Sequence, residues 1–228
     1  MKIGGLMNLT LLDYPDKVAC TVFTVGCNFR CPFCHNNTLV CGNGGRQISE
    51  NEILSFLKKR QGVLEGMCLT GGEPLIQNGV EDFLRRVKDL GYSVKLDTNG
   101  AFPDRLRALI DAGLVDYVAM DIKNSRERYA ETAGCAVDIK AIEQAVDLLK
   151  SGIADYEFRT TVTGNHHDER SIEDTARWIA GAKRYYLQMF VNSGDLIDGL
   201  TTGCGEEQMR RYLDIVKRYV PSAELRGI

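Results

Sequence analysis

Short apolar segments rich in β-branched or aromatic residues alternate along the chain with longer segments whose apolar residues recur at helical spacing. This alternation is typical of repeated strand–helix units around a parallel sheet. It predicts six strands, at Val18–Thr24, Gly66–Thr70, Ser93–Asp97, Tyr117–Ile122, Glu157–Thr163 and Tyr185–Val191. Six units are too few to close an eight-stranded barrel, so the α/β sheet is expected to be a doubly wound open sheet or a partial barrel.

The helices predicted between these strands have recognisable starts and ends. Ser49 and Glu52 form a capping box before an apolar stretch, and Ser171 is expected to begin a later helix. Four more helices are predicted, and a glycine follows each of the first three, where a left-handed residue is favoured. They are Val80–Leu90, Asp104–Ala112, Ile139–Lys150 and Glu206–Tyr219, with Gly91, Gly113 and Gly152 near the first three ends.

Length and composition fit a single folded domain over residues 1–228. The chain is 44% hydrophobic and 26% charged, as in ordinary globular proteins, and no repeat or low-complexity linker divides it. The net charge of −3 and the lack of a basic block leave no electrostatic footprint for nucleic acid. No segment approaches ~18 consecutive apolar residues, and the first residues lack the apolar stretch of a signal peptide. We expect a cytoplasmic protein that binds neither nucleic acid nor a membrane.

Polar residues stand at or just after the end of every predicted strand. Burying such groups costs several kcal/mol unless they are paired, so a core built only for stability gives no reason for this pattern. Salt bridges among them are the alternative explanation for any single residue. Because the C-terminal ends of the strands bear the binding residues in both candidate architectures, the pattern predicts a site there.

Three of the eight cysteines, Cys27, Cys31 and Cys34, lie within eight residues at the spacing C-x3-C-x2-C. Converging thiolates select zinc, copper(I) or iron–sulfur. A structural zinc would need a fourth ligand, from His35 or Cys41, and would normally show paired C-x2-C knuckles. A cubane cluster normally has four cysteine ligands; with three, one iron stays open, as in a catalytic metal site.

The remaining cysteines and a histidine pair have simpler explanations. Free cysteine packs as a small buried apolar residue, which is the expectation for Cys20, Cys41, Cys68, Cys135 and Cys204. His166 and His167 follow the fifth strand and are expected in a solvated loop, with contacts to a partner or to the pocket as the alternative.

The sequence resembles the radical S-adenosylmethionine (SAM) superfamily. The match lies in C-x3-C-x-aromatic-C, with Phe33 as the aromatic residue, and in Gly71-Gly72-Glu73-Pro74 after the second strand. Asp97-Thr98-Asn99-Gly100 and Asp121-Ile122-Lys123 make it most similar to activating enzymes of glycyl radical proteins. It looks most like the short activating proteins of anaerobic ribonucleoside-triphosphate reductase, which are related to the pyruvate formate-lyase activating enzyme.

This resemblance implies a partial (β/α)6 barrel with a largely parallel sheet and a [4Fe-4S] cluster on the three cysteines. SAM would bind the open iron through its methionine amino and carboxylate groups. One electron, from a flavodoxin or ferredoxin type donor, would cleave SAM to methionine and a 5′-deoxyadenosyl radical. That radical would take hydrogen from a glycine of a large glycyl radical enzyme. No catalytic residue is expected beyond the cluster and SAM, because the cofactors carry the chemistry.

The resemblance also implies the residues of the SAM pocket. Glycine at 71 and 72 lets the backbone approach a ligand, and Glu73 with nearby carbonyls can accept from the methionine ammonium. Lys123 suits the methionine carboxylate as a point cation. The other expected contacts are Phe33 and the His35 backbone near the adenine, Asp97 and Asn99 at the ammonium or ribose, Asp121 at the ribose, and Arg159 and Gln188 completing the pocket.

Two alternatives stay open from the sequence. One is a radical SAM enzyme acting on a small molecule, of the 7-carboxy-7-deazaguanine synthase kind, and the other is a structural zinc-binding module. The gap from Cys34 to Ser49 is too short for the ferredoxin-like insert of some activating enzymes, so a single cluster is expected. Gln188 stands where the pyruvate formate-lyase activator is expected to have a histidine, which leaves that contact open.

Overall fold

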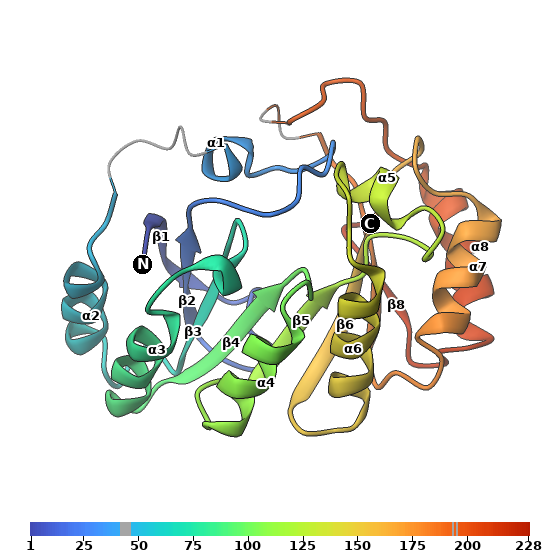
Figure 1. Cartoon of the computed structure of the whole chain (residues 1–228). Helices are drawn as coiled ribbons and strands as arrows, with labels where there is room; N and C mark the ends of the chain where they lie inside the picture. Colours follow the sequence, from blue (N-terminus) through green and yellow to red (C-terminus); the bar gives the residue numbers. More distant parts are fainter. Residues whose placement is uncertain (42–46, 193, 195) are drawn as a thin grey trace. The chain divides into compact units, whose positions relative to one another are not determined.

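The computed structural model describes residues 1–41, 47–192, 194 and 196–228. Across these residues, eight strands follow one another in a single sheet in the order of the sequence (Figure 1). The first, β1 (Ile3–Thr10), runs antiparallel to β2 (Ala19–Thr24), whereas β2 and β3 (Gly66–Gly71) pair in parallel. A doubly wound sheet reverses its strand order, and this one does not. The partial-barrel form of the α/β prediction is therefore confirmed.

The six predicted strands are all present, as β2 to β7, but the prediction of only six was wrong. The later ones are β4 (Ser93–Thr98), β5 (Tyr117–Asp121), β6 (Asp155–Val162) and β7 (Tyr185–Met189). The sequence pattern missed β1, which contains two glycines and has three consecutive exposed residues, so it lacks the alternation of a half-buried strand. It also missed β8 (Glu224–Arg226), which has only three residues.

Helix boundaries follow the capping residues. In α2 (Glu50–Lys59) the Ser49 side chain accepts from the Glu52 amide and the Glu52 carboxylate accepts from the Ser49 amide, as predicted. The predicted start of α7 (Glu169–Trp178) at Ser171 was wrong, because Asp168 is the N-cap and accepts from the Ser171 amide at 2.8 Å. The other predicted helices are α3 (Val80–Asp89), α4 (Pro103–Asp111), α6 (Ile139–Lys150) and α8 (Glu206–Lys217). The pattern missed α1 (Asn37–Val40), α5 (Tyr129–Ala133) and the 3-10 turn η1 (Pro74–Ile76).

The chain divides into two compact units. The first comprises Met1–Asn28, Thr38–Thr98 and Phe102–Ala119, and the second Phe29–Asn37, Asn99–Ala101 and Met120–Ile228. The expectation of one domain over the whole chain stays a prediction. None of the helices in the described part of the chain has the length and apolar character needed to cross a bilayer.

In the first unit, the core forms on the strands β2, β3 and β4. Side chains alternate across a strand, and the fully buried Met67 and Leu69 of β3 lie in register with Val94 and Leu96 of β4. The helix α3 lies beside β4 and buries Phe83 and its apolar neighbours (Figure 1). The residues between these apolar positions face the other side of the sheet, where polar side chains of β3 and β4 can lie.

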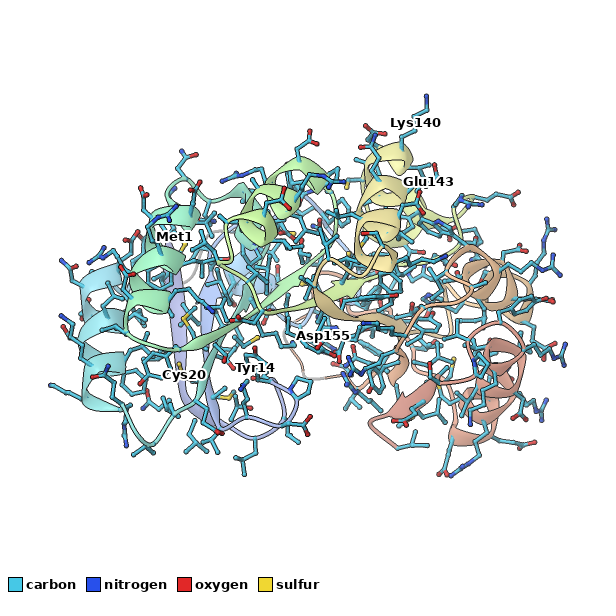
Figure 2. The ribbon with its side chains drawn as sticks, turned by 90° about the horizontal axis from the view of Figure 1, so that it is seen from below. Met1, Tyr14, Cys20, Lys140, Glu143 and Asp155 are labelled. Carbon is cyan, nitrogen blue, oxygen red and sulfur yellow. The ribbon has the colours of Figure 1, made fainter. Side chains whose placement is uncertain are left out.

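In the second unit, β6, β7 and β8 pair in parallel, and α7 packs against α8. The helix α6 buries one apolar face, whereas Lys140 and Glu143 extend outward from it (Figure 2). Large aromatic side chains, among them Tyr156, Phe158 and Tyr185, fill the core. The buried face and the outward charges are what an amphipathic helix requires.

Candidate cofactor site

The Gly-Gly-Glu segment after β3 packs against the end of β2 in the first unit. The amides of Gly72 and Glu73 donate to the carbonyls of Thr24 and Gly26, each at 2.9 Å. A Cβ on Gly72 would lie 1.9 Å from the Gly26 carbonyl oxygen, and one on Gly71, whose φ is 115°, would lie 2.3 Å from the Thr24 nitrogen. The glycines are therefore required by close backbone packing just before Cys27, a reason that the sequence did not show.

Glu73 is a buried carboxylate with structural hydrogen bonds. Its side chain is 1% exposed, and Oε1 accepts from the Leu75 amide at 3.0 Å and from the Thr98 hydroxyl at 2.9 Å. It caps η1 and also ties β3 to β4. These bonds compensate the burial of a charged group and hold the segment after β3 in place.

Asp97 forms an ion pair with a buried lysine that the sequence analysis did not predict. Lys95, two residues earlier on β4, is 1% exposed, and its ammonium forms a short ion pair with Asp97 Oδ1. The Cys68 thiol of β3 donates to the same oxygen at 3.5 Å. A lysine between two apolar strand residues, Val94 and Leu96, was the available signal.

The second unit contains two of the three predicted cluster ligands. Cys31 is 7% exposed, and the Cys34 amide donates to the Cys31 carbonyl at 3.0 Å, so the two residues flank a tight turn. Burial raises the pKa of the Cys31 thiol to about 11, and the Lys123 ammonium acts in the opposite direction. Cys27 is half-buried and belongs to the first unit.

The turn between these cysteines is anchored to the rest of the second unit. The Arg30 amide donates to the Ala133 carbonyl and the Asp198 amide donates to the Pro32 carbonyl, both at 2.9 Å. Gly134, at a φ of 67°, lies so close that a Cβ there would be 2.1 Å from the Arg30 carbonyl oxygen. These backbone contacts hold the turn against the rest of the second unit.

A cluster of three charges lies at the end of β5 and on the neighbouring Arg159 of β6. Asp121 Oδ2 is 3.0 Å from the Lys123 ammonium, and Asp121 Oδ1 is 3.0 Å from the Arg159 guanidinium. Burial alone would raise the pKa of Asp121, but the two cations lower it to about 2. Burial disfavours the charge of Lys123, yet the Asp121 carboxylate raises its pKa. Two cations therefore share the Asp121 carboxylate, and the Lys123 ammonium lies close enough to Cys31 to act on its thiol.

The other predicted pocket residues of the second unit make separate contacts. The ring of Phe33 is buried, with its centroid 6.3 Å from that of His166, and His35 stacks on Phe190 at 5.4 Å. Asn99 accepts from the Ala101 amide at 3.0 Å and so shapes its own turn. Gln188 lies in β7, in register with Thr161 and Arg226.

The prediction of a solvated loop at His166 and His167 was wrong. His167 is 5% exposed; the Thr163 amide donates to its Nδ1 at 3.2 Å, which leaves the hydrogen on Nε2 to donate to the Lys123 carbonyl at 3.0 Å. Burial lowers the pKa of His167 to about 4. His166 Nδ1 lies 3.7 Å from the Glu131 carboxylate. His167 thus holds the backbone of Lys123, a role visible only from tertiary contacts.

The packing prediction for the scattered cysteines holds for some and fails for others. Cys20 and Cys68 are fully buried, as predicted. Cys41 is exposed, and Cys135 and Cys204 are half-buried, because they lie outside the apolar faces of the strands. Cys135 is near enough to Cys31 to act electrostatically on its thiol.

The donor set fits an iron–sulfur cluster. Within the ranges that the structure describes, no three His, Cys, Asp or Glu side chains converge closely enough to hold one metal ion. A cluster is a larger group, and its thiolate ligands bind different irons. Thiolates are the ligands that iron–sulfur clusters select, and the Lys123 ammonium supplies positive charge beside Cys31.

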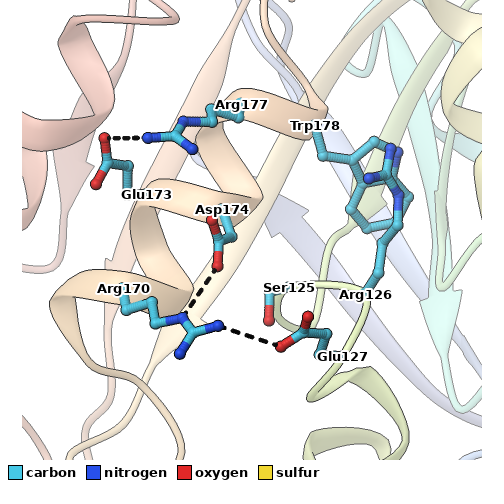
Figure 3. A pocket seen from close by; sticks show the side chains of 8 residues that line it. All are labelled: Ser125, Arg126, Glu127, Arg170, Glu173, Asp174, Arg177 and Trp178. Carbon is cyan, nitrogen blue, oxygen red and sulfur yellow. Dashed lines mark hydrogen bonds and ion pairs between the residues drawn. The ribbon is translucent and has the colours of Figure 1, made fainter.

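A separate pocket of about 640 Å³ lies on the second unit (Figure 3). Its arginines are paired: Arg177 lies 2.9 Å from Glu173, Arg170 lies 3.8 Å from Asp174, and Arg126 covers the Trp178 ring at 5.0 Å. It contains none of the site residues that the sequence predicts.

The family profile of the radical SAM superfamily matches residues 21–179. The chain belongs to the radical SAM superfamily. A candidate glycyl-radical enzyme activating enzyme from Methanocaldococcus jannaschii is 32% identical over 237 residues, covering 99% of this chain and 96% of that protein. The 7-carboxy-7-deazaguanine synthase of Thermoplasma acidophilum is 34% identical over 130 residues, 57% of each chain.

Solved structures confirm the fold. A radical SAM methyltransferase from Sphaerobacter thermophilus superposes with a TM-score of 0.73 at 15% identity, over 96% of this chain and 68% of that one. Membership of this superfamily implies a [4Fe-4S] cluster and SAM as cofactors, and it makes the chain a radical SAM enzyme. The alternative of a structural zinc module is overturned by this membership.

Proposed function

We propose that this radical SAM enzyme generates a glycyl radical on a large partner enzyme, an anaerobic ribonucleoside-triphosphate reductase. The observation that carries the proposal is similarity over nearly the full length of both chains to a candidate glycyl-radical enzyme activating enzyme. The partner subtype is supported by the short cluster loop and by the Asp97-Thr98-Asn99-Gly100 segment. A flavodoxin or ferredoxin type protein would supply the electron. A single working domain, a cytoplasmic location and the lack of nucleic-acid or membrane binding stay predictions from the sequence.

Cys27, Cys31 and Cys34 would hold the [4Fe-4S] cluster, as their spacing supports. When bound, the cluster supplies the electron that cleaves SAM. Lys123 would bind the methionine carboxylate, supported by its positive charge and by its place beside Arg159 at the shared Asp121 carboxylate. Because Asp121 is already shared between two cations, its main role here would be to hold them in place, with the ribose contact secondary.

The remaining pocket residues keep the roles that the sequence suggests. They lie on the strands or in the loops that follow them. They are Gly71, Gly72 and Glu73 at the methionine ammonium, Asp97 and Asn99 at the ammonium or ribose, Phe33 and His35 at the adenine, and Arg159 and Gln188 at the edge of the pocket.

The experiment uses protein purified without oxygen, with its cluster reconstituted. Cys31→Ala should lose the visible absorbance of the cluster and the reductive cleavage of SAM, measured as 5′-deoxyadenosine. Cys204→Ala is the matched control, since it removes a half-buried thiol outside the cluster loop. Normal 5′-deoxyadenosine formation by Cys31→Ala would refute the ligand assignment.

The partner is tested by electron paramagnetic resonance. Reduced protein, SAM and the reductase should together give a doublet-type glycyl signal, which should be missing when Cys31→Ala replaces the wild type. The second candidate, a small-molecule enzyme of the 7-carboxy-7-deazaguanine synthase kind, is favoured by the Thermoplasma similarity. SAM cleavage stimulated by a small molecule, with no glycyl signal, would select it instead.

A further inference from the structure

The first unit contains a lysine in a place where stability alone gives no reason to keep it. Lys95 lies in the middle of β4 and is 1% exposed. Its neighbours Val94 and Leu96 point to the opposite, apolar face of the sheet, while Lys95 and Asp97 share the other face. Burying an ammonium is expensive, and a buried ion pair is often no more stable than apolar residues of the same volume.

The contacts of Lys95 converge on one carboxylate. Its ammonium pairs with Asp97 Oδ1, and the Cys68 thiol, in register with Lys95 on β3, donates to that same oxygen at 3.5 Å. The ammonium also lies 3.9 Å from the Cys68 sulfur. A cation and a thiol from two adjacent strands therefore fix one oxygen of Asp97, whose side chain is 14% exposed.

We propose that Lys95 is a positioning residue for SAM, which acts by keeping the Asp97 carboxylate ionised and fixed in orientation. The inference rests on the proposed function, in which Asp97 contacts the ammonium or ribose of SAM. A carboxylate held by two donors on one oxygen loses little further freedom when a ligand binds, so more of the contact energy appears as affinity. Lys95 itself lies in the strand interior and acts through Asp97.

The arrangement differs from that of Asp121. Asp121 is shared by two cations, whereas Asp97 receives one lysine and one thiol on the same oxygen. A carboxylate held in this way is suited to accept from an ammonium or hydroxyl donor. This is the chemistry expected of the Asp97 contact.

The experiment is a double-mutant cycle on the reconstituted protein, using Lys95→Met, Asp97→Asn and the double variant. Removing one partner of a charge-assisted hydrogen bond should weaken SAM binding by about tenfold in each single variant. The double variant should lose no more than Asp97→Asn alone, because Lys95 acts only through Asp97. The KM for SAM should rise while kcat at saturating SAM stays close to that of the wild type, and Lys95→Arg should recover most of the affinity.

A matched control removes another lysine–aspartate pair from the same unit. Lys88 of α3 lies 2.7 Å from Asp116 at the surface, and Lys88→Met should leave SAM affinity unchanged. Cluster absorbance and thermal unfolding are recorded for every variant. If Lys95→Met does not fold, a further loss of SAM affinity in the double variant relative to Asp97→Asn still overturns the inference, because Lys95 would then act other than through Asp97.

Three results would overturn the inference: wild-type affinity in Lys95→Met, losses that add in the double variant, or an Asp97→Asn protein that binds SAM normally. All three presuppose a wild-type protein that holds its cluster and cleaves SAM. A wild type that does neither refutes the proposed function instead.

Discussion

Mild acid is predicted to destabilise the folded protein through one buried histidine, His167. Its ring is 5% exposed and joins the Thr163 amide to the Lys123 carbonyl. Burial lowers the pKa of this ring from 6.5 to about 4, and the nearby charges of His166 and Arg128 act in the same direction. Protonation would place a charge on a buried ring and would remove the acceptor for the Thr163 amide.

The direction in which stability changes with pH follows from which state of the chain binds more protons. The unfolded chain protonates this ring near pH 6.5, whereas the folded chain does so only near pH 4, so the unfolded state binds more protons between these values. Stability from this group is complete above pH 6.5 and is lost as the pH falls. This difference in pKa lowers the free energy of unfolding by about 2 kcal/mol between pH 7 and pH 5, and by about 3 kcal/mol by pH 4.

Urea denaturation of wild type and His167→Gln at pH 7 and pH 5 measures the effect. His35, whose pKa burial also lowers, and His166 are present in both proteins, so their contributions cancel in the comparison. Asp121, with a pKa of about 2, contributes to the loss of stability in acid only when the pH falls below the ordinary pKa of an aspartate side chain. The wild type should lose about 2 kcal/mol more than the variant over this interval. Equal pH dependence in the two proteins would refute the reasoning, as would a His167 ring that titrates above pH 6 by nuclear magnetic resonance.

Three further substitutions test the site. Gly72→Ala should prevent folded protein from accumulating, because the added Cβ would lie 1.9 Å from the Gly26 carbonyl oxygen. The control Gly199→Ala should unfold at the wild-type temperature, because a Cβ at position 199 would have no atom within 4 Å. Asp121→Asn should lower the free energy of unfolding by about 2 kcal/mol in urea, because two cations lose their shared, partly exposed counter-ion; an unchanged value would contradict the pairing. Lys123→Ala should weaken SAM binding in a titration but leave 5′-methylthioadenosine, which lacks the methionine carboxylate, nearly unaffected, and equal losses for both ligands would exclude the carboxylate contact.

Local chemistry explains which elements could be predicted from the sequence. The strands β2 to β7 are apolar on at least one face, and Gly91, Gly113 and Gly152 take left-handed φ values of 87°, 67° and 81° after their helices. A glycine in that position is readable without tertiary information. The start of α7 was misplaced because serine serves both as an N-cap and as the third residue of a capping box, and only the hydrogen bonds distinguish the two.

The predicted site depends on motifs. Spacing alone points to the three cysteines as ligands, and the resemblance adds Lys123 and its neighbours; these assignments stay predictions. Lys95 and His167 were missed because a charged or titratable residue looks like a surface residue until its partners are known. Their partners, Asp97 and the carbonyl of Lys123, belong to motif segments, so polar residues that flank a motif segment or pair with it across the fold are the ones to inspect first.

The two units bury charge in different ways. In the first unit, the Asp97 carboxylate receives the Lys95 ammonium and the Cys68 thiol on one oxygen. In the second unit, the Asp121 carboxylate serves both Lys123 and Arg159, and the Lys123 ammonium acts on the Cys31 thiol. A low local dielectric makes each of these pairs electrostatically stronger than the same pair would be in water. The Lys123 ammonium is therefore suited to an anionic group, and the Asp97 carboxylate is suited to a proton donor.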